Sequence, residues 1–403
     1  MYLTHLSLTN YRAFTRLDMD VPRRILLLVG DNAQGKTSLL EAVFYLAVFS
    51  SFHAQSDRQL INFLADGEPL AVARIVAEYQ RGDHKHRMEV RLIRESNNNG
   101  NGRLRKEILL DGVRKTVSQA LGHFNAVIFL PQMMRIIEDG PDQRRRYLNI
   151  AIAQAIPEYA TALSKYSQAL TQRNALLRLL GERGGDRDQL MYWDGLLAEY
   201  GSQIILNRIR AIREIEANAV RIHHQLTHSR EVLRIVYQPS YDPVVRPQGQ
   251  YELPLSAPIE RRGFDIETIG KGFMKRLEEL RSEEIGRGVT TVGPHRDEVR
   301  FLSNGVDLGY YGSRGQARTA LLSLKLAEVA WLKEKTGFWP VVLLDEILAE
   351  LDTQRREDLL RYLDKEQQVL LTTTDLNLFE EQFVKSSTVW HVNAGRVVET
   401  EIS

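Results

Sequence analysis

The feature that most constrains this chain of 403 residues is the octapeptide from Gly30 to Thr37, which fits the pattern G-x-x-x-x-G-K-[ST]. A short run of isoleucine, leucine and valine, residues 25–29, precedes the octapeptide. An apolar run with helical spacing, residues 37–49, follows it. Strand, glycine-containing loop and helix in this order predict a phosphate-binding P-loop rather than a chance match. The sequence therefore favours an α/β fold in which a buried strand leads into the loop.

The residue types in this loop each have a chemical reason. Gly30 and Gly35 let the backbone curl so that successive N–H groups point toward phosphate oxygens. Lys36 supplies a positive charge to the β- and γ-phosphates, and the Thr37 hydroxyl can bind Mg²⁺. The N-terminus of the following helix adds its dipole. We expect nucleotide contacts from the whole loop, which comprises Gly30, Asp31, Asn32, Ala33, Gln34, Gly35, Lys36, Thr37 and Ser38.

A second element predicts the other half of an ATP site. The apolar run 340–344 ends in Asp345 and Glu346, as in a Walker B strand that is buried on both faces of a central sheet. We expect Asp345 to hold Mg²⁺ and Glu346 to act as the general base, so Glu346 and Lys36 are the predicted catalytic residues. A strand that merely ends in two acids is the alternative. Because the two halves lie far apart in the sequence, the nucleotide domain must contain a large insertion.

A third motif, Ser313 to Gln316, begins the helix expected over 317–335. The Ser313 hydroxyl, the Gly315 backbone and the helix dipole could together bind a γ-phosphate, with Gln316 beside them. One chain cannot easily direct both this motif and its own P-loop at the same ATP, whereas two chains arranged head to tail can. The sequence therefore predicts a homodimer that forms with ATP.

Two more residues near strand ends are candidate nucleotide contacts. Arg12 follows the strand expected over residues 2–8 and could reach the nucleotide, although a surface arginine in a turn is the alternative. Asp375 follows the strand expected over 368–371, at the place where a γ-phosphate sensor is expected.

An unusual cluster of charge marks the start of another helix. Asp142 is expected to cap a helix whose first turn carries Arg144, Arg145 and Arg146, although cations oppose the dipole at a helix N-terminus. The cluster predicts contact with DNA phosphates or with a partner, and a solvated helix start explains it equally well.

Two long helices are expected to follow. Apolar residues three and four apart over 157–180, with one gap of seven, and again over 189–224 predict an antiparallel helical hairpin. The hairpin carries arginines that form either a basic face or a solvated side shared with glutamates, namely Arg208, Arg210, Arg213 and Arg221.

The remaining segments are read from their local composition. Runs rich in valine, isoleucine and leucine at 70–79, 86–94 and 105–110 predict antiparallel strands, because their connections are too short for parallel crossovers. Residues 97–102 are expected to form a hairpin tip, and the proline-rich segment 239–258 a loop.

Composition excludes several classes of protein. The chain has no cysteine, which excludes disulfides and thiolate metal sites and fits a cytoplasmic protein. No apolar run approaches the roughly 20 residues of a membrane helix, so no membrane contact is expected. The net charge is +1, so a surface for DNA must be local rather than global.

Taken together, the motifs resemble those of the RecF family, bacterial recombination mediators within the SMC group of ABC-type ATPases. The most specific are Gly293-Pro294-His295-Arg296-Asp297 and Gly315-Gln316-Ala317-Arg318-Thr319, and the resemblance spans nearly the whole chain. The other matching segments are 10–12, 30–37, 144–148, 324–328 and 372–375.

The resemblance implies ATP and Mg²⁺ as cofactors and weak, DNA-stimulated ATP hydrolysis that resets an ATP-dependent homodimer. It implies binding to double-stranded DNA and to gapped or junction DNA in repair, replication, recombination and the SOS response. RecR, and RecO indirectly, would be the partners in loading recombinase. The implied fold is an ABC/SMC-type ATPase head. Its lobe I would comprise the ATPase domain and an antiparallel β subdomain, residues 1–120 and 236–403, and lobe II a helical arm, residues 121–235.

The chain departs from the family pattern at several positions. Glu346 stands where a second Asp is usual, and Ala349 where a serine is usual. Gln132 is assigned as the glutamine that senses Mg²⁺. A sensor histidine is absent, so Thr374 and Asp375 take that role by analogy. An ATPase subunit of another SMC-like complex or an ATPase-nuclease of the OLD type is the alternative. Finishing the sheet is expected to use most of the residues after Glu346, which argues against the nuclease.

Overall fold

The computed structural model describes residues 1–66, 68–95, 103–244, 260–363 and 367–400. The expected hairpin tip 97–102 and most of the proline-rich segment 239–258 lie outside these ranges. Contacts divide the chain into two units, the first made of Met1–Gln132 and Glu328–Ser403, and the second of Met133–Ala327. Among the described residues, no helix combines the length and the apolar character that crossing a membrane requires.

A mixed six-stranded sheet in the order β15-β14-β3-β13-β12-β8 forms the centre of the first unit. All neighbours in it are parallel except β14 and β15. Its strands are β3 (Ile25–Val29), β8 (Ala126–Phe129), β12 (Val341–Asp345), β13 (Val369–Thr373), β14 (Thr388–Asn393) and β15 (Arg396–Thr400). β12 and β13 are buried along their whole length and β3 at all but its first residue, which explains their uninterrupted apolar sequences. Because β3, β12 and β13 are parallel, their carboxyl ends meet at one edge of the sheet.

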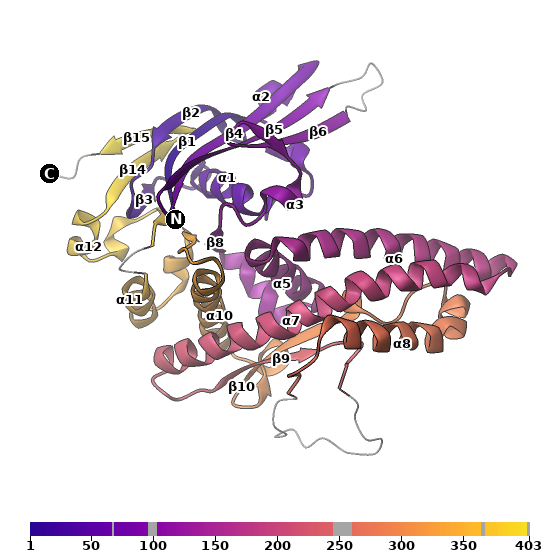
Figure 1. Ribbon diagram of the computed structural model, residues 1–403. Coiled ribbons are helices and arrows are strands. Elements are labelled where there is room, and N and C mark those ends of the chain that lie inside the picture. Colours follow the sequence, from indigo (N-terminus) through magenta and orange to yellow (C-terminus); the bar gives the residue numbers. More distant parts are fainter. Residues whose placement is uncertain (67, 96–102, 245–259, 364–366, 401–403) are drawn as a thin grey trace. The chain divides into compact units, whose positions relative to one another are not determined.

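A second sheet in this unit is antiparallel, in the order β2-β1-β4-β5-β6-β7, and arches over α1 (Figure 1). It confirms the three antiparallel strands expected between residues 70 and 110. Its strands are β1 (Tyr2–Tyr11), β2 (Phe14–Asp20), β4 (Leu70–Arg81), β5 (His84–Glu95), β6 (Arg103–Leu110) and β7 (Val113–Lys115). Helix α1 (Lys36–Val48) contacts β4 of this sheet and β8, β12 and β13 of the other, so it is buried between the two.

Shorter elements complete the first unit. They are α2 (Phe63–Asp66), α3 (Val117–Ala120), α11 (Thr353–Tyr362) and α12 (Glu381–Lys385), with 3-10 turns η1 (Asp57–Leu60), η2 (Pro131–Met134), η5 (Ile347–Glu350) and η6 (Leu376–Leu378). Helix α10 (Arg314–Thr336) begins in the second unit and ends in the first.

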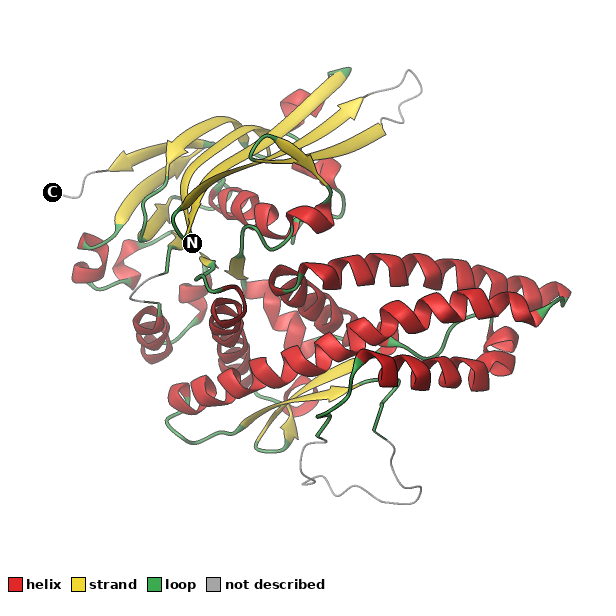
Figure 2. Ribbon diagram, viewed as in Figure 1, coloured by secondary structure: helices red, strands yellow, loops and turns green. Residues whose placement is uncertain are grey.

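Long helices make up most of the second unit, and α6 and α7 run side by side as the predicted hairpin (Figure 2). The helices are α4 (Arg135–Glu138), α5 (Pro141–Ala155), α6 (Pro157–Arg183), α7 (Leu190–Leu226), α8 (Ile266–Arg287) and α9 (Leu308–Tyr311), with turns η3 (Arg187–Gln189) and η4 (Pro294–Arg296). A small sheet, β11-β10-β9, accompanies them, formed by β9 (Leu233–Gln238), β10 (Glu298–Ser303) and β11 (Val306–Asp307).

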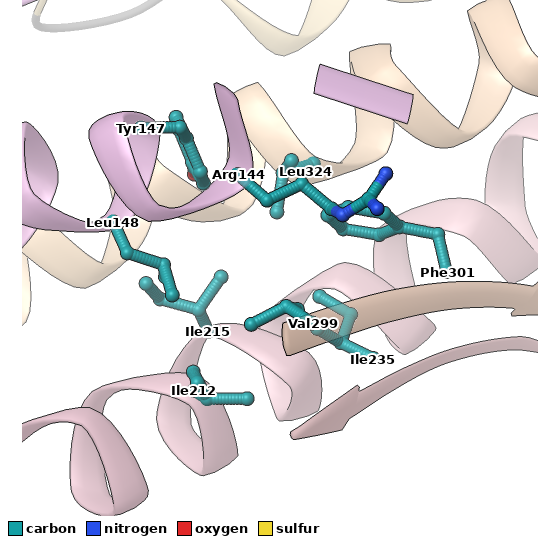
Figure 3. A pocket seen from close by; sticks show the side chains of 9 residues that line it. All are labelled: Arg144, Tyr147, Leu148, Ile212, Ile215, Ile235, Val299, Phe301 and Leu324. Atoms are coloured by element: carbon teal, nitrogen blue, oxygen red, sulfur yellow. The ribbon is translucent and has the colours of Figure 1, made fainter. Parts of the chain in front are cut away.

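The core of this unit lies where α5, α7, β9, β10 and the start of α10 meet. Apolar side chains from all five elements surround a small cavity there, and the stem of Arg144 lines it as well (Figure 3). The apolar side chains are Tyr147, Leu148, Ile212, Ile215, Ile235, Val299, Phe301 and Leu324.

Two arginines of the long helices are buried. One lies within the apolar stripe of α6, and the other was predicted to be exposed. Arg173 fills the gap of seven in the apolar stripe of α6 and bonds to Asp194 and Glu284, both at 2.6 Å. Arg208, predicted to lie on an exposed basic face, is only 2% exposed and bonds to Asp297 at 2.7 Å. That placement corrects the prediction for Arg208, and the other arginines of that face are exposed: Arg210, Arg213 and Arg221.

The contacts divide the chain differently from the expected lobes. Residues 236–327, expected in lobe I, group with the helical arm. The reason is that α8 packs on α6 and α7, while β9 packs on α7 and pairs with β10. Residues 121–132, expected in lobe II, group with the first unit, because β8 pairs with β12 in the ATPase sheet. The lobe boundaries themselves stay a prediction.

Candidate nucleotide site

The loop from Gly30 to Thr37 has the backbone shape that the sequence predicts. Gly35 has a φ of +112° and Ala33 one of +64°, so the chain turns through the left-handed region twice. A Cβ on Gly30 would lie 2.3 Å from the Val392 carbonyl oxygen, so only glycine fits there. Helix α1 begins directly after the loop, at Lys36. This curled loop at a helix N-terminus is suited to bind an anion.

The Lys36 ammonium is folded into the loop and is only 3% exposed. Its Nζ donates to the carbonyl oxygens of Gly30 (2.6 Å) and Asp31 (2.8 Å). It also lies 3.2 Å from Glu346 Oε1. The structure thus brings both predicted catalytic side chains into contact.

Asp345 forms the link between the P-loop and the Walker B strand. Its Oδ1 accepts hydrogen bonds from the hydroxyls of Thr37 (3.0 Å) and Thr372 (2.8 Å). Burial raises the pKa of Asp345, while these two hydroxyls oppose the rise because they stabilise the carboxylate. A carboxylate beside a hydroxyl offers the hard oxygen ligands that Mg²⁺ prefers, so the donor set fits this ion.

Glu346 has a backbone conformation that is unusual for a residue other than glycine. Its φ is +50°, in the left-handed region, directly after the last residue of β12. Its N–H donates to Thr372 Oγ1 at 2.9 Å, and its side chain is 38% exposed. The turn leaves the carboxylate beside Lys36 while solvent can still reach it.

The hairpin β14–β15 supports the P-loop, and sequence reasoning missed it. The N–H of Ala394 donates to Gln34 Oε1 (2.7 Å), and the N–H of Gly395 donates to the Gln34 carbonyl oxygen (3.1 Å). Gln34 is therefore a tether within the unit. A turn signal was present in the sequence, since Asn393-Ala394-Gly395 stands between two valine-rich runs. The loop residues Asp31, Asn32 and Ala33 are exposed, and Ser38 lies in the first turn of α1.

Arg12 is held by an acid on α1. Its Nε and Nη2 donate to the two carboxylate oxygens of Glu41 at 2.7 and 2.9 Å, and its Nη1 to the Gln59 carbonyl oxygen. Glu41 is buried and also accepts from the Ser51 hydroxyl. These bonds explain Arg12 without a nucleotide, so its contact with ATP stays a prediction.

Gln132 and Asp375, the other two predicted contacts of this unit, each have a local partner. Gln132 Nε2 lies 3.5 Å from His53 Nδ1. Burial raises the pKa of Asp345, and the nearby His53 is among the groups that oppose this rise. The Asp375 carboxylate accepts from the N–H of Asn377 at 2.8 Å and caps the turn η6. Their roles as magnesium sensor and γ-phosphate sensor stay predictions.

The motif Ser313 to Gln316 forms a reciprocal cap at the start of α10. The N–H of Gln316 donates to Ser313 Oγ at 3.2 Å, and the N–H of Ser313 donates to Gln316 Oε1 at 3.1 Å. Ser313 is exposed, and within the described ranges of the chain no side chain other than that of Ser313 comes within 4 Å of a Cβ placed on Gly315. The cap accounts for the serine and the glutamine as a helix start, and γ-phosphate binding by Ser313, Gly315 and Gln316 stays a prediction.

The three arginines of α5 have different environments. Arg144 is buried and donates to both carboxylate oxygens of Glu298, at 2.7 and 2.9 Å. Arg145 donates to the Asp297 carbonyl oxygen (2.6 Å) and pairs with Asp142. Arg146 is exposed. Internal partners thus explain the first two cations at this helix start. The DNA or partner contact predicted for Arg144, Arg145 and Arg146 stays a prediction, and Arg146 is the most exposed of the three.

Comparison with known proteins finds relatives that match this protein along nearly its whole chain. The model of the family "RecF/RecN/SMC N terminal domain" matches residues 2–397. The chain is 35% identical over 409 residues to the DNA replication and repair protein RecF of Roseiflexus castenholzii, covering 98% of this chain and 99% of that protein. It is 34% identical over 401 residues to the RecF of an Exiguobacterium species, with both chains fully covered.

Solved structures give the same result. Two structures of the recombination mediator protein RecF in the RecFOR pathway, one of them described as RecF-ATP, match with TM-scores of 0.83 and 0.82. Each is 30% identical and covers 99% of this chain and 98% of its own. The Smc head domain of Pyrococcus furiosus, 16% identical with a TM-score of 0.51, shares the fold.

Proposed function

Because this chain belongs to the RecF family of SMC-type ATPases, we propose that its P-loop and Walker B residues bind and hydrolyse ATP to control DNA binding in recombinational repair. It is an ATP-binding DNA repair and recombination protein with an ABC/SMC-type ATPase head. The observation that carries the proposal is the meeting of the two halves of the site. Thr37 Oγ1 lies 3.0 Å from Asp345 Oδ1, and Lys36 Nζ lies 3.2 Å from Glu346 Oε1.

These residues would divide the work of hydrolysis. The loop amides and Lys36 bind the phosphates, and Lys36 stabilises charge on the γ-phosphoryl group during transfer. Thr37 and Asp345 would hold Mg²⁺, which neutralises phosphate charge when it is bound. Glu346 accepts a proton from the water whose oxygen attacks the γ-phosphorus. The bond from the γ-phosphorus to the bridging oxygen breaks, releasing ADP and phosphate.

The proposed working form is a dimer of two chains arranged head to tail around ATP. Each Ser313 to Gln316 motif would face the γ-phosphate that the other chain's P-loop binds. The exposure of Ser313 and the open space beside Gly315 support this role, because a phosphate must reach both. Slow hydrolysis then removes the γ-phosphate and separates the chains.

The proposed ligand of the dimer is double-stranded DNA and the gapped or junction DNA of repair, bound in the cytoplasm. Arg146 on α5 and the exposed arginines of α7 can contact backbone phosphates, which any DNA sequence presents. The resemblance to proteins of the RecFOR pathway supports RecR as a direct partner and RecO as an indirect one, in loading recombinase.

The test measures solution mass with ATP and Mg²⁺ for the wild type and for Ser313→Asp and Ser313→Arg. Asp is as good a helix cap as Ser, so Ser313→Asp should keep α10 while its charge repels a phosphate. We expect the wild type to become a dimer and both variants to stay monomeric while still binding ATP. The matched control is Ser164→Arg, an exposed serine on α6, which should dimerise normally. Dimerisation of Ser313→Asp with wild-type affinity would refute the γ-phosphate role.

A further inference from the structure

We propose that Thr372 is a positioning residue for ATP hydrolysis, because its single hydroxyl holds both acids of the Walker B pair in place. The inference rests on the proposed ATPase chemistry of Asp345 and Glu346 and adds a residue to it. Thr372 is the fourth residue of β13 and pairs directly with Asp345 across the parallel sheet. It is 1% exposed.

The hydroxyl uses both of its hydrogen-bonding roles on the two acids. Thr372 Oγ1 donates to Asp345 Oδ1 at 2.8 Å. The same oxygen accepts from the N–H of Glu346 at 2.9 Å. One atom therefore fixes the side chain of the proposed metal ligand and the backbone of the proposed general base.

The backbone of Glu346 explains why such a contact is needed. A φ of +50° is unfavourable for a residue with a side chain, so the surrounding structure must hold it. The bond from Glu346 N–H to Thr372 is made at the strand end where the chain enters this turn. This turn places Glu346 Oε1 3.2 Å from Lys36 Nζ. Loss of the hydroxyl should therefore displace the base without removing the phosphate-binding loop.

The strand itself does not require this hydroxyl. β13 begins Val369-Leu370-Leu371 and is buried throughout, so a valine at 372 would suit its pleat and its surroundings. The next residue, Thr373, uses its hydroxyl differently, because it donates to the Asp375 carbonyl oxygen and accepts from the Asp375 N–H. Of these two adjacent threonines, only Thr372 contacts the Walker B acids among the described hydrogen bonds.

The experiment compares Thr372→Val, which has the same shape without the hydroxyl, with Thr372→Ser, which keeps the hydroxyl. Steady-state ATP hydrolysis with DNA gives kcat, titration with mant-ATP gives nucleotide affinity, and thermal unfolding gives Tm. In Thr372→Val we expect kcat to fall about 10- to 100-fold, as for the loss of a hydrogen bond to a charged group, while mant-ATP affinity changes less than about threefold. Thr372→Ser should stay within about threefold of the wild type in both.

A matched control is Thr227→Val, which removes a buried threonine hydroxyl that bonds to the His223 carbonyl oxygen outside the nucleotide site. It should leave kcat and mant-ATP affinity unchanged. The inference is wrong if Thr372→Val hydrolyses ATP like the wild type, if Thr372→Ser is as slow as Thr372→Val, or if affinity falls as much as kcat. Should the valine chain fail to fold, Thr372→Cys, whose thiol is a weak donor, replaces it with the same expectations.

Lys36→Ala separates failure of this inference from failure of the proposed function. If Lys36→Ala leaves the hydrolysis rate unchanged, the P-loop is not the site of the measured activity and the proposed function fails. If Lys36→Ala abolishes hydrolysis and Thr372→Val does not slow it, only the role of Thr372 fails.

Discussion

Both units of this molecule bury charged side chains, but the two units differ in the kind of partner that contacts each buried charge. In the first unit, Lys36 bonds to two carbonyl oxygens of its own loop and lies beside the half-exposed Glu346. In the second unit, Arg173 bonds to Asp194, Glu284 and Thr290, and all four residues are fully buried. The partners of Lys36 are backbone atoms of its own loop and one partly exposed acid, whereas those of Arg173 include buried acids on two other helices, α7 and α8.

This difference separates a binding charge from a structural one. Burying an ion costs several kcal/mol, and only fixed, complete partners offset that cost. Arg173 joins α6 to α7 and α8, and Arg208 joins α7 to the segment around Asp297 in the same way. Lys36 and Asp345 instead keep polar groups that a phosphate or a cation can contact. Burial of a charge alone therefore does not identify a functional site, and the nature of the partners does.

The largest expected effect tests the structural charge. Arg173→Ala leaves the buried Glu284 without its cation and leaves Asp194 with Arg281 alone, so we expect the free energy of unfolding to fall by about 3–5 kcal/mol. Urea unfolding followed by circular dichroism measures the change. The control is Lys271→Ala on α8, where the pair with Glu267 is exposed to solvent and its loss should leave the free energy of unfolding nearly unchanged. Equal costs for the two variants would remove the distinction between structural and surface charges.

The next effect tests the binding charge. Lys36→Ala should lower the rate of ATP hydrolysis at least about 100-fold, or roughly 2.7 kcal/mol, because the γ-phosphoryl group loses its cation. The free energy of unfolding of Lys36→Ala should differ from that of the wild type by less than about 1 kcal/mol. The reason is that water can take the place of Lys36 as the hydrogen-bond donor to the Gly30 and Asp31 carbonyl oxygens. Lys333→Ala is the control, because Lys333 also bonds to a carbonyl oxygen but lies outside the site. Severe destabilisation by Lys36→Ala would place Lys36 in the same class as Arg173.

The smallest effect concerns pH. Burial lowers the pKa of His295 to about 4, and its ring nitrogens lie 2.8 Å from the Tyr166 hydroxyl and 3.2 Å from the Thr290 carbonyl oxygen. The unfolded chain, with a pKa near 6.5, binds the proton first, so stability present at pH 7 is lost as the pH falls from about 6.5 toward 4. From pH 7 to pH 5 the expected loss is about 1–2 kcal/mol.

His295→Gln provides the comparison for this pH effect. Its free energy of unfolding should depend less on pH between 7 and 5 than that of the wild type, whatever its absolute stability. An identical dependence in both chains would assign the effect to other groups.

Sequence reasoning reached the nucleotide site because its residues are adjacent in the chain or follow strands. The loop from Gly30 to Thr37 and the two acids at the end of β12 have the expected positions, and the hairpin of α6 and α7 is confirmed. The predicted basic face of the hairpin was wrong at Arg208, which is buried. At the start of α5, Arg144 and Arg145 have internal partners that the sequence did not indicate. A pattern of charge along a helix does not indicate whether an acid from a distant segment, such as Glu298 or Asp297, will meet it.

What the sequence determined by itself was local: the glycines and the lysine of the P-loop and a helix start at Ser313, together with apolar strands that had to be buried and a family resemblance across the chain. What only the tertiary structure decided was which distant residues meet. Thr372 and Asp345 become neighbours through parallel pairing of β13 with β12, and Arg173 reaches Glu284 through the packing of α6 against α8. The physical reason is that local backbone preferences act within a few residues, whereas sheet register and helix packing join segments that the sequence separates.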